Sequence, residues 1–410
     1  MDYNNVPFTK EMKKTHTILV PDMLPNHFKL ITRIMKKYGY NMVLLESSAR
    51  AVIDEGLKSV HNDTCYPALL VIGQFLEALK SGRYDTDKTA LMISQTGGGC
   101  RASNYIHLLR KALATDFPNV PVISLNFSKT ERSDGFKLTL PMIFSLLNAI
   151  FYGDLIMSLY NQCKPYEIVE NETDKALKEC LDMLYDKCDN GGFGNRKKNY
   201  RYILEAFSKI RRNKIRKPRV GIVGEIYVKY SPLANNNLEK FLLHEGCEPV
   251  VPGLMDFVLY CIVNYINDGK IYGFKNIRTR VSSMLYSILR KMNKTVIDMM
   301  SEYGFTPPHD FEDLRKEADE LIHQGVKMGE GWLITAEMGC LAASGTENIV
   351  CTQPFGCLPN HIVAKGMSRR VKEKYPYANI VAIDYDPSAT SVNQENRLKL
   401  MIANIGAVSG

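Results

Sequence analysis

Three of the ten cysteines share one position, each at the start of a predicted helix. Cys65 and Cys357 are each followed two residues later by a proline, which is favoured in a first helical turn because its missing N–H would be unpaired there. Cys100 follows three glycines and opens a helical pattern. Helix N-termini offer unpaired N–H groups and partial positive charge, which favour thiolates and the sulfides of an iron–sulfur cluster. The shared position therefore indicates one common anionic ligand.

The spacing of the cysteines does not fit a local metal motif. No two of them have the C-x2-C spacing of a zinc knuckle or ferredoxin loop. Cys65 and Cys100 are 35 residues apart, and Cys357 lies 257 residues further on, so the fold would have to assemble a shared cluster. Cys351, on an apolar segment six residues before Cys357, is the candidate for a fourth thiol. The alternative for all four is a buried structural cysteine.

Two other residues could handle protons at such a site. Glu225 follows an apolar segment directly after Gly224, and His361 lies in the first helical turn after Cys357, so both are candidate catalytic residues. Gly98 and Gly99 are candidate cofactor-binding residues, because a backbone without side chains can approach a cluster sulfide closely.

The elements that must position these residues form two α/β lobes. Short apolar strands alternating with helices predict parallel sheets covered on both faces, as in Rossmann-like or flavodoxin-like folds. We expect a first lobe over 1–147, a helical connection with a basic segment over 148–217, and a second lobe with a helical insertion over 218–410. The predicted strands are 17–21, 41–45, 90–94, 120–125, 219–223, 248–251, 348–352 and 379–383.

Ligands bind at the carboxyl ends of the strands in such sheets, which predicts a cluster site in the cleft between the lobes. Gly97, Gly99 and Ala102 also match the dinucleotide fingerprint G-x-G-x-x-A. However, the next strand ends at Asn126 without the acidic residue that would bind a ribose, and a lone fingerprint is a weak signal.

The net charge of +8 is concentrated in one segment. Residues 195–219 contain eleven Lys or Arg and one acid, Glu205. A single basic block between near-neutral halves is typical of a solvated linker helix, with docking of an acidic partner or contact with a coenzyme A phosphate as alternatives. We expect no nucleic-acid partner.

The composition fits a cytoplasmic protein without a membrane segment. The polar N-terminus resembles no secretory signal, and the longest uncharged run, between Lys137 and Asp154, is shorter than the roughly 18 residues of a membrane helix. Ten cysteines in a reducing compartment are not expected to form disulfides.

Four segments carry a resemblance to a known family. Residues 62–68, 94–105, 223–227 and 353–361 resemble the 2-hydroxyacyl-CoA dehydratase subunit family. The resemblance is closest to its branch of double-cubane cluster proteins and of the carboxyl-terminal part of acyl-CoA dehydratase activase-related proteins. It covers nearly the whole chain. In that family three similarly spaced cysteines per subunit hold a [4Fe–4S] cluster, which matches Cys65, Cys100 and Cys357.

The resemblance implies an electron-accepting component of an ATP-dependent, low-potential reductase system. Its partner would be a separate cluster-bearing activator with an actin-like ATPase fold, because this chain has no G-x-x-x-x-G-K-[ST] loop. The substrate would be a 2-hydroxyacyl-CoA thioester that loses water after one-electron reduction, and a homo- or heterodimer is expected. Two alternatives stay open: a double-cubane [8Fe–9S] reductase of small unsaturated molecules, and a non-catalytic electron carrier.

Overall fold

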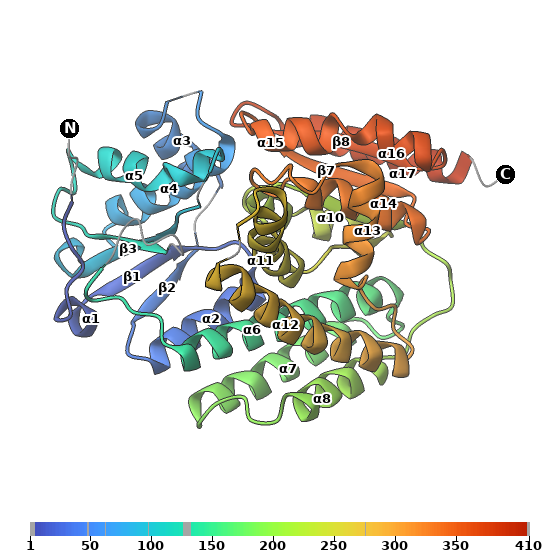
Figure 1. Cartoon of the computed structure of the whole chain (residues 1–410), viewed down its shortest axis with the longest axis horizontal. Coiled ribbons are helices and arrows are strands. Elements are labelled where there is room, and N and C mark those ends of the chain that lie inside the picture. Colours follow the sequence, from blue (N-terminus) through green and yellow to red (C-terminus); the bar gives the residue numbers. More distant parts are fainter. Residues whose placement is uncertain are drawn as a thin grey trace.

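The computed structural model confirms an α/β protein with two parallel sheets of four strands each (Figure 1). It describes residues 5–46, 49–61, 63–96, 98–125, 133–274 and 276–407. Gly97 and Asn126, which entered the fingerprint argument, lie outside these ranges.

The first sheet has the strand order β2-β1-β3-β4. Helices α3, α4 and α5 cover one face, where Leu19 and Leu91 are buried, and α2 and the start of α6 cover the other. The elements of this lobe are α1 (Met12–Thr15), β1 (Thr17–Pro21), α2 (Pro25–Lys37), β2 (Met42–Leu45), α3 (Ala49–Ser59), α4 (Tyr66–Lys80), η1 (Thr86–Lys88), β3 (Thr89–Ser94), η2 (Arg101–Ser103), α5 (Tyr105–Leu113) and β4 (Val122–Leu125).

The second sheet has the equivalent order, β6-β5-β7-β8. Both lobes therefore have the 2-1-3-4 arrangement of flavodoxin-like folds, in which ligands bind where the strand order reverses. These reversals lie between β1 and β3 and between β5 and β7. The elements are β5 (Arg219–Gly224), α9 (Ile226–Tyr230), α10 (Leu238–His244), β6 (Glu248–Val250), α14 (Trp332–Ala343), β7 (Asn348–Pro354), α15 (Leu358–Asn360), the π-helical turn η4 (His361–Lys365), α16 (Ser368–Lys374), β8 (Asn379–Tyr385) and α17 (Ser391–Ala407).

A helical body lies beside both sheets and contains the largest apolar cluster (Figure 1). Helix α2 of the first lobe packs against α6 and α7, which joins that lobe to the body. The helices of the body are α6 (Leu140–Cys163), η3 (Lys164–Tyr166), α7 (Glu172–Asp189), α8 (Arg196–Ser208), α11 (Leu254–Ile271), α12 (Ile277–Glu302) and α13 (Phe311–Leu321).

Within the described ranges, only the segment Leu140–Tyr166 is long and apolar enough to cross a membrane. It packs against α2, α7, α8 and α11 and carries Asp154, whose carboxylate bonds the buried His27. These contacts are typical of the core helix of a soluble protein, with which the structure is compatible.

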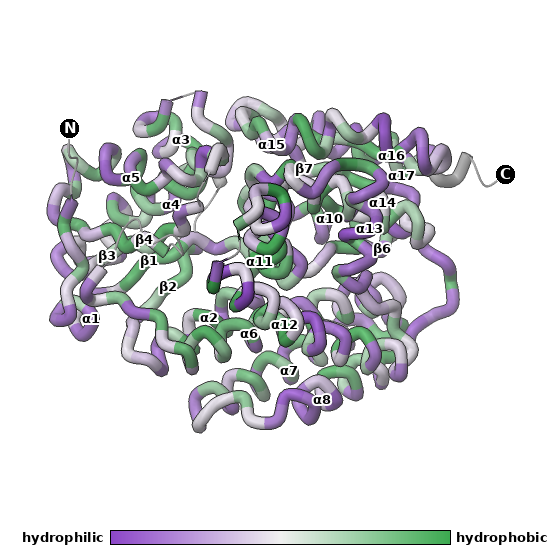
Figure 2. The backbone as a smooth tube through the Cα atoms, in the orientation of Figure 1, coloured by the Kyte–Doolittle hydropathy of each residue, from purple (hydrophilic) through white to green (hydrophobic). Residues whose placement is uncertain are grey.

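The basic segment differs from the expected linker helix. Helix α8 ends at Ser208, and residues 209–218 continue in extended form along the outside of the molecule, as a hydrophilic run in Figure 2. Residues 209–218 form one β-type contact with the helical body, an isolated antiparallel bridge between Glu167 and Arg212. Closely spaced like charges oppose a helix there, since they would be stacked on neighbouring turns.

Candidate interlobe cysteine site

Each of the three cysteines has an extended backbone conformation and immediately precedes a helical turn. The position before a helical turn is the one that the sequence predicts. Cys65 (φ −65°, ψ 149°) precedes α4, Cys100 (φ −73°, ψ 139°) precedes η2, and Cys357 (φ −84°, ψ 96°) precedes α15. Cys100 follows β3 and Cys357 follows β7. Both cysteines therefore lie beyond the carboxyl end of a strand that borders the point where the strand order of its sheet reverses.

The loops that carry Cys65 and Cys357 contact each other directly. The backbone N–H of Tyr66 donates to the carbonyl of Phe355 over 2.9 Å. Gly356 has a φ of 74°, and a Cβ added there would lie 3.1 Å from the Cα of Cys65. The two lobes therefore meet at these two cysteines, in a contact that a side chain at position 356 would crowd.

The loop that carries Cys100 reaches the same region through the segment before α14. A Cβ on Gly99 would overlap the sulfur of Met328, and one on Gly329 would lie 3.4 Å from carbons of Pro359. Residues 328–329 therefore lie between the Cys100 and Cys357 loops. Gly99 is used for packing against Met328, whereas Gly98, with a φ of 80°, has open space where its Cβ would be.

The Cys65 thiol lies within electrostatic range of the other two thiols. A charge on Cys65 would raise the pKa of both Cys100 and Cys357. Burial is the largest effect on all three: it raises the pKa of Cys65, raises that of Cys100 to about 11, and raises that of Cys357 well above its usual range. The free thiols are therefore protonated at neutral pH.

Helix N-termini oppose this effect of burial. The N–H groups of Ala68, Ala102 and Asn360 favour the thiolates of Cys65, Cys100 and Cys357 respectively, although none of these thiols makes a side-chain cap hydrogen bond.

Tyr105 adds a partner for Cys65. Its hydroxyl is hydrogen-bonded to the Cys65 sulfur at 2.7 Å and lowers the pKa of that thiol. Only Cys65 of the three has such a side-chain partner in the described part of the chain, so Cys65 is the most precisely positioned thiol.

Two carboxyl groups, those of the half-buried Glu225 and the buried Glu330, complete the site. Glu225 directly follows β5 and caps α9 by accepting from the N–H of Val228 at 2.9 Å, and Glu330 accepts from the N–H of Ile226 at 3.0 Å. Burial raises the pKa of both, that of Glu225 to about 8, and each would repel the charge of Cys357. Burial therefore favours the neutral acid form of Glu225, and repulsion by Glu330 adds to this effect.

Sequence reasoning did not find Glu330. The signal was present, because Glu330 stands between Gly329 and Gly331 immediately before a predicted helix, and a charged residue in a tight glycine turn is unusual. Its role depends on a contact with Ile226, which is far away in the sequence, so the local sequence does not encode it. We call Cys65, Cys100, Cys357, Glu225 and Glu330 the interlobe cysteine site.

The other candidate residues are not gathered at this site. Cys351 is 1% exposed and packs into an apolar cluster that contains none of the three thiols, with its sulfur 3.4 Å from that of Met338. The side chain of His361 is exposed, and its Nδ1 contacts the carbonyl of Cys357 at 2.7 Å instead of the sulfur. The structure therefore does not bring Cys351 to the three thiols.

Comparison with models of known protein families gives no match, and comparison with curated proteins gives none either. The geometry of the site is therefore the basis for assigning a function.

Among the described residues, no three His, Cys, Asp or Glu side chains come together closely enough to hold one metal ion. The thiolates that bind a four-iron cluster each bind a different iron, so they surround a volume instead of converging on a point. Cys65, Cys100 and Cys357, at the starts of helical turns on separate loops, are therefore not arranged as the ligands of one ion.

Proposed function

We propose that the chain binds an iron–sulfur cluster through Cys65, Cys100 and Cys357. It would act as the electron-accepting component of an ATP-dependent, low-potential reductase system like the 2-hydroxyacyl-CoA dehydratases. The observation that supports the proposal is that three cysteines, each at the start of a helical turn, lie on separate loops of the two lobes, which contact one another directly or through residues 328–329. A cluster bound there would supply single electrons at low potential.

The roles of the remaining residues follow from their contacts. Tyr105 orients the Cys65 sulfur through its hydroxyl. Glu225, whose pKa burial raises to about 8, can donate a proton to a bound substrate anion, and Glu330 accepts from the N–H of the neighbouring Ile226. Three thiols leave the position of a fourth ligand to a non-cysteine group, which is where a substrate oxygen could bind. We place the protein in the cytoplasm, where the thiols stay reduced.

The test is anaerobic purification followed by counting iron and acid-labile sulfide per chain. About four of each are expected for one [4Fe–4S] cluster, and about eight iron would favour the double-cubane alternative. A folded protein that takes up no iron under reconstitution would contradict the proposal.

Single substitutions locate the ligands. Cys100→Ala and Cys357→Ala should each lose most of the iron, because they remove thiols from different lobes. Cys180→Ala is the matched control, since Cys180 is buried in the helical body and belongs to its apolar cluster. Equal iron in all three variants would show that the cluster lies elsewhere. Thioester dehydration with and without a matched activator then separates an enzyme from an electron carrier.

A further inference from the structure

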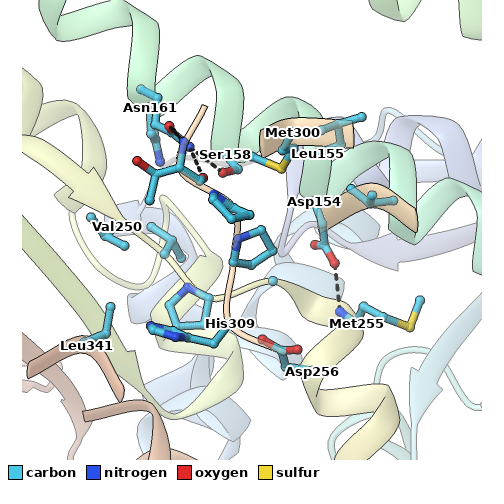
Figure 3. A pocket seen from close by; sticks show the side chains of 18 of the residues that line it. Asp154, Leu155, Ser158, Asn161, Val250, Met255, Asp256, Met300, His309 and Leu341 are labelled. Carbon is cyan, nitrogen blue, oxygen red and sulfur yellow. Dashed lines mark hydrogen bonds between the residues drawn. The ribbon is translucent and has the colours of Figure 1, made fainter. Parts of the chain in front are cut away.

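A second polar feature is an internal cavity between the helical body and the edge strand β6. The cavity measures about 150 Å³. Figure 3 shows its wall, formed by helices α6, α11, α12 and α14 and by segments 248–253 and 306–309. Much of that wall is apolar, including Leu155, Val250, Met255, Met300 and Leu341. This combination of an apolar wall with a few polar groups is typical of a binding site for a small molecule.

Among the described acidic residues of this wall, only the carboxyl group of Asp256 has no hydrogen-bond or ion-pair partner. Asp256 lies in the first turn of α11 and is 6% exposed. The nearby Asp154 is different, because its carboxylate accepts from the N–H groups of Leu254 and Met255 and bonds His27. In Figure 3 Asp256 and His309 both face the cavity.

The other buried charges of the wall are balanced. Glu337 pairs with Lys229 at 3.1 Å, and Glu248 pairs with Arg219 at 3.3 Å. Asp256 therefore gives the cavity an unbalanced carboxyl group. The charges of Glu337, Asp154 and Asp310 act on this carboxyl group and disfavour an anionic ligand, and a metal ion lacks the three clustered ligands it would need among the described residues.

We propose that this cavity binds a small organic cation, whose ammonium group contacts Asp256 and whose carbon chain packs against Leu155, Met300 and Leu341. An engineered cavity of ~150 Å³ accommodates benzene, so the ligand would have about six heavy atoms. The proposal does not depend on the interlobe cysteine site or on its cluster.

The charges around Asp256 predict how it responds to such a ligand. Burial raises the pKa of Asp256 well above its usual range, Glu337, Asp154 and Asp310 raise it further, and Lys229 lowers it. The raised pKa favours the protonated carboxyl group of Asp256 in the absence of a ligand, and a bound ammonium group would favour release of that proton. Proton uptake by the buffer on binding is a signature that simple apolar binding lacks.

Three probes of nearly equal shape test the proposal: pentylammonium, 1-pentanol and valerate. Binding to the purified chain is measured by ligand-observed NMR and by calorimetry in two buffers of different ionisation enthalpy. We expect pentylammonium to bind in the millimolar range or tighter, with proton release, at least about tenfold more tightly than 1-pentanol, and valerate not to bind.

Two variants address the wall itself. Asp256→Asn should weaken pentylammonium at least about tenfold and leave 1-pentanol unchanged. Ser158→Leu, which adds volume to the wall on α6, should weaken both and keeps the test available if Asp256→Asn does not fold. Equal binding of the three probes, no binding of any of them, or unchanged pentylammonium affinity in Asp256→Asn would overturn the proposal.

Discussion

Tyr66 and Phe355 join the two lobes by a backbone hydrogen bond of 2.9 Å. Each residue lies within two positions of a cysteine of the interlobe cysteine site, so the bond fixes the Cys65 loop against the Cys357 loop. The apolar core follows the same route, because one continuous cluster contains residues of both sheets, including Leu91 and Val350. The lobes are therefore packed together at the proposed cluster site.

Gly356→Ala should disrupt this contact. The substitution places a Cβ on a residue with a φ of 74°, 3.1 Å from the Cα of Cys65. Gly345→Ala is the matched control, because Gly345 has a φ of 79° but nothing within 4 Å of an added Cβ. The control should lose about 1 kcal/mol of unfolding free energy, and Gly356→Ala a further ~1–3 kcal/mol from overpacking.

Urea unfolding under anaerobic conditions measures this difference, and iron analysis follows its effect on the site. Gly356→Ala should lose iron while Gly345→Ala keeps it. Equal destabilisation of the two variants would mean that the loops adjust without cost and that the lobe contact is not fixed.

Tyr105→Phe should slow the reaction of Cys65 with alkylating reagents. The Tyr105 hydroxyl lowers the pKa of the Cys65 thiol, so its removal raises that pKa and reduces the thiolate fraction at a given pH. Mass spectrometry of Cys65 labelling across a pH series in the cluster-free protein gives the shift. Tyr66→Phe, which removes a hydroxyl beside the same cysteine, should leave the profile unchanged; an equal shift in both variants would refute a specific role for Tyr105.

The position of the cysteines before helical turns could be predicted, because it depends on local signals such as Pro67 and Pro359. The alternation of strands and helices was also readable, although the helix Ala49–Ser59 was missed. The composition of the site was not readable. Glu330 lies in a loop in which Met328 packs against Gly99, a contact between residues more than two hundred positions apart. Such a contact leaves no periodic pattern in the sequence.

Glu225→Gln should change how stability depends on pH. Burial, and then repulsion by Glu330, raise the pKa of Glu225 to about 8 in the folded protein, whereas an unfolded glutamate titrates near about 4.3. The folded state therefore binds the proton more tightly. Its contribution to stability is complete below pH ~4.3 and is lost as pH rises to about 8, by at most ~1.4 kcal/mol per pH unit.

Glutamine cannot ionise but can still accept from the N–H of Val228. The unfolding free energy of Glu225→Gln should thus fall less steeply between about pH 5 and about pH 8 than that of the wild type. Urea unfolding of the cluster-free protein at several pH values measures both slopes. Glu373→Gln, at an exposed position on α16, controls for general charge effects. Parallel curves for Glu225→Gln and the wild type would show that Glu225 does not take up a proton on folding.

Cys351→Ala separates a core thiol from a cluster ligand. Cys351 and Cys357 are only six residues apart, but the alternation of side chains along β7 directs Cys351 into the apolar cluster with Val223, Met338 and Ile349. Removing its sulfur should cost about 1 kcal/mol of unfolding free energy, as for a small buried cavity, and should leave the iron content unchanged. Cys357→Ala should show the opposite balance, losing iron with a smaller packing defect because its neighbourhood includes the exposed Phe355 and Leu358. Iron loss in Cys351→Ala at wild-type stability would establish Cys351 as a fourth ligand and would require β7 to rearrange when the cluster binds.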